Sequence, residues 1–136
     1  MNKFVMAYGA ALVTMVIIDL LWLGVIARPL YQQGIGHLMA EKPNLAAAVL
    51  FYLLYPVGIV VFAIAPDAAN ATWLKTFSTA AMLGLFAYAT YDLTNLATLK
   101  GWPISLAAVD MAWGSLVTGV SALAGKLALD RFSAVS

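Results

Sequence analysis

Four long runs of apolar residues, separated by short polar segments, dominate the hydrophobic pattern along this chain. The runs cover about residues 4–27, 45–65, 74–96 and 103–127. Each run exceeds the ~20 residues that a helix needs to cross the ~30 Å hydrocarbon core of a bilayer. The alternating segments of ~10 residues that mark a membrane β-barrel do not occur in the sequence. The pattern therefore predicts an all-α fold, an integral membrane bundle of four transmembrane helices.

The connections between the runs contain residues that end helices. Proline disfavours helix at the residue before it, so we expect the first helix to end at Arg28 and Pro29. Residues 66–72 and 100–103 separate the later runs, and residues 30–39 are compatible with a short interfacial helix, although its apolar face is ragged. No connection is long enough to fold alone, which predicts a single transmembrane domain over residues 1–136.

Composition supports a membrane protein and excludes several other classes. Hydrophobic residues make up 64% of the chain and charged residues 10%, whereas a soluble domain carries about 25% charged residues. The net charge of +1 argues against nucleic-acid binding, which needs a concentrated basic patch. The absence of cysteine from the sequence excludes disulfides, thiolate catalysis and cysteine metal sites. The first run is too long for the ~7–15-residue core of a signal peptide, so we expect it to be retained.

Three aspartates lie inside the runs at one expected depth. Counting 1.5 Å of rise per residue places Asp19, Asp92 and Asp110 about 10–12 Å from the membrane surface opposite the termini. An ionised acid that faces lipid costs about 2.5–3.5 kcal/mol, so we expect all three to point inward at a shared pocket. Tyr52 and Tyr55 share one face of the second run and reach the same level.

Helical spacing adds further polar and aromatic residues to the faces that carry these acids. The candidate ligand-binding residues are Asp19, Trp22, Tyr52, Tyr55, Tyr88, Asp92, Asn95, Asp110 and Trp113. No lysine or arginine lies deep in a run, so either Arg28, Lys42 or Lys100 reaches in from the connections or some of the acids carry a proton. The alternative is structural, with tyrosine and tryptophan donating hydrogen bonds that fasten the acids between helices.

Four strings along the chain carry a family likeness. They are DLLWLG at residues 19–24, FYLLYP at 51–56, YATYDLTNLATLKGWP at 88–103 and DMAWG at 110–114. With these strings the chain resembles an uncharacterised bacterial family of small predicted membrane proteins, a domain of unknown function. The resemblance extends over essentially the whole chain and implies placement in the bacterial inner membrane. It implies no activity.

Three classes of function fit these features. The first is an intramembrane pocket that binds a small cation or an amphipathic, lipid-like ligand, because carboxylates beside tyrosine and asparagine suit proton relay, hard-cation ligation and amine binding. The second is an accessory subunit of a larger membrane complex. The third is a small transporter, which would need a second copy to enclose a path. No motif names a reaction, a metal or a cofactor, so the sequence leaves open whether the protein is an enzyme.

The basic residues outside the membrane core predict the orientation. They divide between the side of the termini, with Lys3, Lys75, Lys126 and Arg131, and the other side, with Arg28, Lys42 and Lys100. Positive residues concentrate on the cytoplasmic side of membrane proteins, so this division favours cytoplasmic termini.

Overall fold

A computed structural model describes residues 2–66 and 68–135 of the chain, which are helical with no strand among them. The α-helices are α1 (Lys3–Leu21), α2 (Arg28–Ile35), α3 (Leu45–Ile59), α4 (Trp73–Thr98) and α5 (Ile104–Val135). The π-helical turns η1 (Trp22–Ile26) and η3 (Val60–Ile64) continue α1 and α3, and the 3-10 turn η2 (Gly36–Leu38) follows α2. The expected all-helical fold is therefore confirmed.

The four predicted runs correspond to α1 with η1, α3 with η3, α4, and α5. Within the described ranges, three of these helices are long and apolar enough to cross a membrane: Lys3–Ile26, Leu45–Ile64 and Ile104–Ser133. Although α4 has 26 residues, its threonine, serine and tyrosine side chains lower its hydropathy. The structure thus supports three candidate spans and has α2 as a fifth helix, whereas the sequence predicted a bundle of four spans.

Side-chain caps explain where three of the helices begin. The carboxamide oxygen of Asn2 accepts a hydrogen bond from the Phe4 amide at 2.8 Å, and Asn44 accepts one from the Ala47 amide at 3.1 Å. Thr72 caps α4 by accepting from the Lys75 amide at 3.1 Å. Each cap satisfies an amide that the first helical turn leaves without a partner. The break after the first run lies at Ala27, one residue before the predicted position, and Pro29 falls in the first turn of α2.

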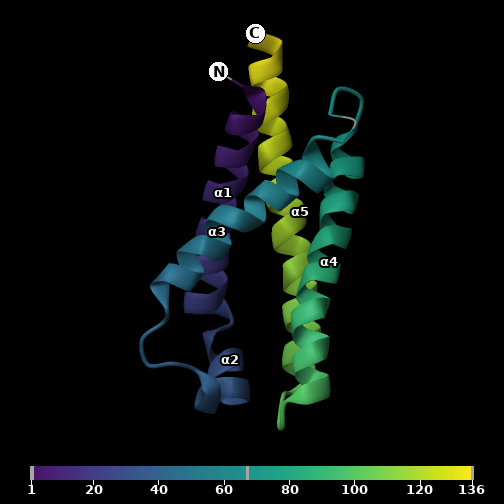
Figure 1. The fold of residues 1–136 in the computed structure, drawn as a ribbon. Coiled ribbons are helices and arrows are strands. Elements are labelled where there is room, and N and C mark those ends of the chain that lie inside the picture. The colour runs from purple at the N-terminus through teal and green to yellow at the C-terminus, as the bar shows by residue number, and fades with distance from the viewer. Residues whose placement is uncertain (1, 67, 136) are drawn as a thin grey trace.

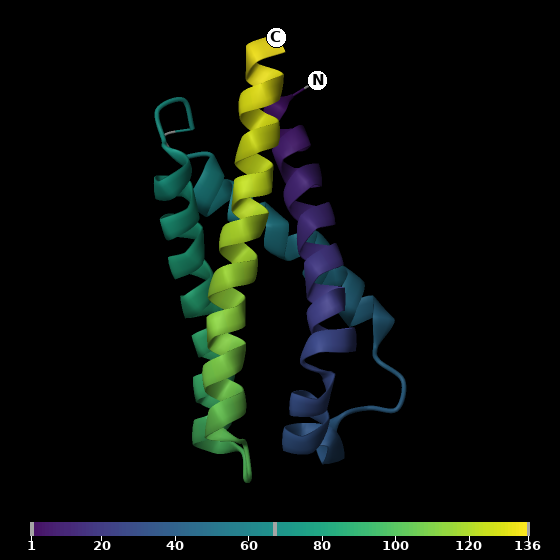
Figure 2. The same cartoon turned by 180° about the vertical axis from the view of Figure 1, so that it is seen from behind.

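The helix α5 is the centre of the molecule, with α1 packed on one side and α4 on the other (Figure 1 and Figure 2). The helix α3 crosses obliquely over α1, and it meets α4 and α5 mainly through η3. Both termini lie at one end of the molecule, while α2 and the turn between α4 and α5 lie at the other (Figure 1). The C-terminal continuation of α3, η3, is the part that packs against α4. The first half of α3 therefore leaves room between the two helices.

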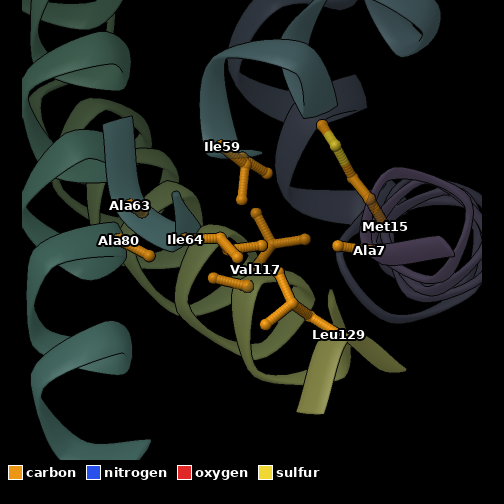
Figure 3. Packing of buried hydrophobic residues seen from close by; sticks show 9 residues of the cluster. Ala7, Met15, Ile59, Ala63, Ile64, Ala80, Val117 and Leu129 are labelled. Carbon is orange, nitrogen blue, oxygen red and sulfur yellow. The ribbon is translucent and has the colours of Figure 1, made fainter. Parts of the chain in front are cut away.

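Small residues allow the close packing of the core. A Cβ atom on Gly84 would lie 2.2 Å from the carbonyl oxygen of Gly114 and 2.5 Å from Oγ1 of Thr118, so α4 and α5 could not approach as they do. Near this contact Ile59, Ile64 and Val117 point toward one another from α3, η3 and α5 (Figure 3). The core thus joins the helices at the height of η3, above the region where the polar residues gather.

The outer faces of the long helices are apolar as well. Exposed apolar side chains occur on each of them, including Val13 on α1, Leu54 on α3, Phe86 on α4 and Leu116 on α5. A helix that is hydrophobic all round needs either a large protein core or lipid around it. Since these faces are exposed, they are suited to the hydrocarbon of a bilayer.

Candidate functional site

A pocket of about 530 Å³ lies among α1, α2, α3, α4 and α5 in the half of the molecule that contains α2. Two carboxyl groups line it, those of Asp19 and Asp110. Most of the remaining surface is aromatic or apolar, from Phe51, Trp113, Leu23, Ala48 and Ala87 and from five tyrosines: Tyr31, Tyr52, Tyr55, Tyr88 and Tyr91. The pocket is therefore an apolar space with a few polar groups, as ligand sites usually are.

Asp19 is fixed by hydrogen bonds to both of its carboxyl oxygens. Its side chain is 5% exposed. The Tyr52 hydroxyl donates to Oδ2, and the indole Nε1 of Trp113 donates to Oδ1 at 2.9 Å. Both carboxyl oxygens of Asp19 therefore have a hydrogen-bond donor, although the side chain is buried.

Asp110 is fixed by a residue from α2. The Tyr31 hydroxyl donates to Oδ1 of Asp110, whose side chain is 7% exposed, and Nε1 of Trp22 donates to the Tyr31 oxygen at 3.2 Å. Burial, together with the hydrogen bond to Asp110, raises the pKa of Tyr31 above its usual range, so the phenol keeps the proton that it donates. Trp22 also stacks on Trp113 with ring centres 4.4 Å apart, which connects the surroundings of Asp110 to those of Asp19.

Asp92 lies behind the pocket and has the least favourable surroundings of the three acids. Its side chain is 0% exposed, and neither carboxyl oxygen has a hydrogen-bond partner in the described part of the chain. It is close enough to Asp110 for the two carboxyl groups to interact electrostatically. Burying two neighbouring carboxylates is costly unless a proton or a cation offsets their charge.

Tyr55 and Tyr88 shape the side of the pocket nearest the core. The Tyr55 and Thr118 hydroxyls are hydrogen-bonded at 2.8 Å, and Thr118 in turn donates to the carbonyl oxygen of Gly114 at 2.6 Å. The Tyr88 ring rests on Gly114, where a Cβ atom would lie 2.1 Å from the ring. The Tyr88 hydroxyl forms no hydrogen bond within residues 2–66 and 68–135, so it remains able to bond a ligand.

The predicted site residues are only partly brought together. Six of them line the pocket: Asp19, Tyr52, Tyr55, Tyr88, Asp110 and Trp113. Trp22 joins the network through Tyr31 and Trp113, while Asp92 and Asn95 do not line the pocket. That these residues bind a ligand stays a prediction.

Two tyrosines of the pocket are missing from the predicted set. Tyr31 belongs to α2, outside the apolar runs, so a count of depth along spans could not include it. Tyr91 follows Tyr88 by three residues and therefore shares its helix face, a spacing that could have identified it. Together the pocket residues supply carboxylates, phenols and indoles, groups that accept and donate hydrogen bonds and attract cations. The described residues contain no group of three or more His, Cys, Asp or Glu side chains placed to hold a metal ion.

No curated protein and no solved structure is significantly similar to this chain. A family model described as "Predicted membrane protein (DUF2177)" matches residues 4–127, a range that contains every residue of the pocket. The match confirms the likeness seen in the four strings. The chain therefore belongs to this family of predicted membrane proteins, whose function is unknown.

Proposed function

We propose that this protein crosses the bacterial inner membrane four times and binds an amphipathic, lipid-like ligand in the pocket between its helices. The observation that carries the proposal is a largely apolar pocket in which buried carboxyl groups and tyrosine hydroxyls converge. Its volume of about 530 Å³ lies within the range of small-molecule sites. The polar head of the ligand would meet these groups, and its chain would contact the apolar surface.

The position of α4 supports four crossings. It runs beside α5 along its length (Figure 1 and Figure 2), and α5 is itself long and apolar enough to span a membrane. A helix packed in this way lies at the same depth as its neighbour. Its polar residue Asp92 is buried against α5 instead of facing lipid, which lowers the cost of placing an acid in the membrane. Four crossings also agree with termini that lie at one end.

The open side of the pocket supports entry of the ligand from the bilayer. Phe51 on α3 is 40% exposed and Tyr91 on α4 is 53% exposed, although both line the pocket. The opening between them follows from the packing of α3 against α4, which is made mainly through η3. A hydrocarbon chain can pass through an apolar opening of this kind without crossing water.

No specific observation favours the two other functions, an accessory subunit of a membrane complex and a small transporter. Exposed apolar faces suit a protein partner in a membrane complex, and they suit a second copy of the chain in a dimeric transporter. They suit lipid equally well. The pocket therefore favours ligand binding over both.

Photolabelling with a panel of three probes tests the proposal. Each probe has a hexadecyl chain with a diazirine near the head, and the heads are trimethylammonium, sulfate and an uncharged glyceryl group. The protein is reconstituted in nanodiscs of an uncharged glycolipid, and labelled residues are located by mass spectrometry. We expect at least one probe to label residues around the pocket saturably. The Ala87→Trp change, which fills the pocket, should lower this labelling roughly tenfold.

The matched control is Ala97→Trp, which places the same bulk on an exposed part of α4 outside the pocket. It should label like the unchanged protein. If all three probes label only the outer helix faces, and Ala87→Trp labels like Ala97→Trp, the proposed function is wrong.

A further inference from the structure

We infer that the ligand of this pocket carries a cationic head group of the amine or quaternary ammonium class, held between Asp110, Asp19 and the faces of the tyrosine rings. The inference rests on the proposed function and adds the chemistry of the head group, which neither the family nor the fold specifies.

The first argument is the charge of the pocket. Asp19 and Asp110 line it, and none of its lining residues in the described chain is Lys, Arg or His. The hydrogen bonds around these acids are donated to them: two reach Asp19 and one, from Tyr31, reaches Asp110. Such neutral donors satisfy carboxyl oxygens but bring no positive charge. A buried anionic site of this kind is completed by a cation.

The second argument is Asp92, which adds a further carboxyl group behind Asp110. It is fully buried, and its two oxygens have no hydrogen-bond partner among the described residues. It is close enough to Asp110 for the two carboxyl groups to interact, and a cation beside Asp110 would allow both to ionise. A cationic head group therefore has a favourable place next to this pair, and an anionic one does not.

The third argument is the orientation of the rings. Tyr55 and Tyr88 meet edge to face, with centres 6.5 Å apart and planes at 69°. Phe51 lies 5.3 Å from Tyr55 with its plane at 21° to that ring. These three rings line one pocket at different angles, and aromatic side chains around a common space are the usual recognition device for quaternary ammonium groups.

An organic cation fits this combination better than the other head groups. A sulfate or phosphate would face two carboxylates without a basic residue to bind it. An uncharged hydroxyl head could bond the free Tyr88 hydroxyl but would leave the carboxylate charge in place. A trimethylammonium group has an apolar surface that can contact the rings and a charge that can offset the acids.

The same three probes test the head group by competition. We expect the trimethylammonium probe to bind the unchanged protein at least roughly tenfold more tightly than the sulfate or glyceryl probe. Asp110→Asn and Asp19→Asn should each weaken binding of the trimethylammonium probe roughly tenfold, and should weaken binding of the glyceryl probe much less. The matched control is Asp130→Asn, which removes an exposed carboxylate that pairs with Lys126 outside the pocket and should leave the relative affinities of the three probes unchanged.

The possible outcomes separate this inference from the proposed function. If the glyceryl or sulfate probe labels the pocket and is blocked by Ala87→Trp, but the trimethylammonium probe binds no better, ligand binding stands and the cationic head group is wrong. If no probe labels the pocket, both fail. The relative affinities of the three probes for the unchanged protein are measured without any variant. The inference therefore stays testable even if an aspartate replacement fails to fold.

Discussion

Gly114 is the residue that determines where the Tyr88 ring lies, and hence the shape of the pocket beside it. The ring occupies the space of a side chain at this position, since a Cβ atom would come within 2.1 Å of it. The Gly114 carbonyl oxygen also accepts the hydrogen bond from Thr118, which in turn is bonded to Tyr55. One glycine thus sets the position of two of the pocket tyrosines.

We expect Gly114→Ala to destabilise the protein and to reduce probe labelling in the pocket. The added methyl group must displace the Tyr88 ring or separate α5 from α4, and overpacking of this kind costs about 1–3 kcal/mol. Thermal unfolding in a fixed detergent, followed by circular dichroism, measures the loss. Gly9→Ala is the control, because nothing lies within 4 Å of the added Cβ on α1. Equal melting temperatures for the two variants would show that the contact with Tyr88 does not limit packing.

The residues of the pocket could be predicted from the sequence only where facing lipid would cost free energy. An acid in an apolar run must turn away from lipid, and this identified Asp19 and Asp110 together with the tyrosines at the same level. No comparable cost applies to Tyr31, because a tyrosine beside two glutamines in a polar connection is unremarkable. Asn95 is the opposite case, since it shares a helix face with Asp92 but does not line the pocket.

The short helix α2 shows how one element closes the end of the pocket. A second apolar cluster joins it to the start of α5, with Leu30, Tyr31 and Ile35 packed against Trp102 and Leu106. The hydrogen bond from Tyr31 to Asp110 adds a polar link at the same place. An eight-residue helix is not stable alone, so α2 depends on these contacts.

We expect Tyr31→Phe to loosen α2 and weaken the fold. The change keeps the ring but removes the donor to Asp110, leaving a buried acceptor without its partner, which costs about 1–3 kcal/mol. Hydrogen exchange measured by mass spectrometry should become faster over residues 28–38. The control for stability is Tyr91→Phe, whose hydroxyl forms no hydrogen bond in the described chain. Unchanged exchange in Tyr31→Phe would mean that the apolar cluster alone holds α2.

The helices themselves differ in how well the sequence predicts them. The ends of α4, of α1 with η1, and of α3 with η3 follow from caps and breakers near them in sequence, and their predicted bounds lie within a few residues of the observed ones. α5 continues to Val135, beyond the predicted end at 127, because Lys126 and Asp130 pair along the helix and do not interrupt it. The helix α2 depends on contacts with α5 that are distant in sequence, so its docking could not be predicted.

The arrangement of the whole molecule is harder to predict than its elements. In a helix that is apolar on every side, hydrophobic periodicity does not show which face turns inward. The signals that remain are the acids and the small residues, and in the structure Gly84 and Gly114 lie where α4 and α5 meet. Nothing of that kind sets the oblique course of α3 over α1 (Figure 1), although α3 supplies four residues of the pocket lining.

At the scale of the whole molecule, the proposed topology makes a prediction about three connections. If α4 crosses the membrane, the connection before it, at Ala69, and the turn after it, at Lys100, lie on opposite sides. Glu41, between α2 and α3, should then lie on the same side as Lys100. The excess of basic residues on the side of the termini favours a cytoplasmic location for Ala69.

Single cysteines at these exposed positions can test this arrangement directly, because the chain has no cysteine of its own. In intact spheroplasts, a membrane-impermeant maleimide should modify Glu41→Cys and Lys100→Cys but reach Ala69→Cys only after the membrane is permeabilised. The reverse pattern would keep four crossings and place the termini outside the cytoplasm. Equal labelling of Ala69→Cys and Lys100→Cys in intact spheroplasts would contradict a crossing by α4. The pocket, which takes Tyr88 and Tyr91 from this helix, could then not open within the bilayer as proposed.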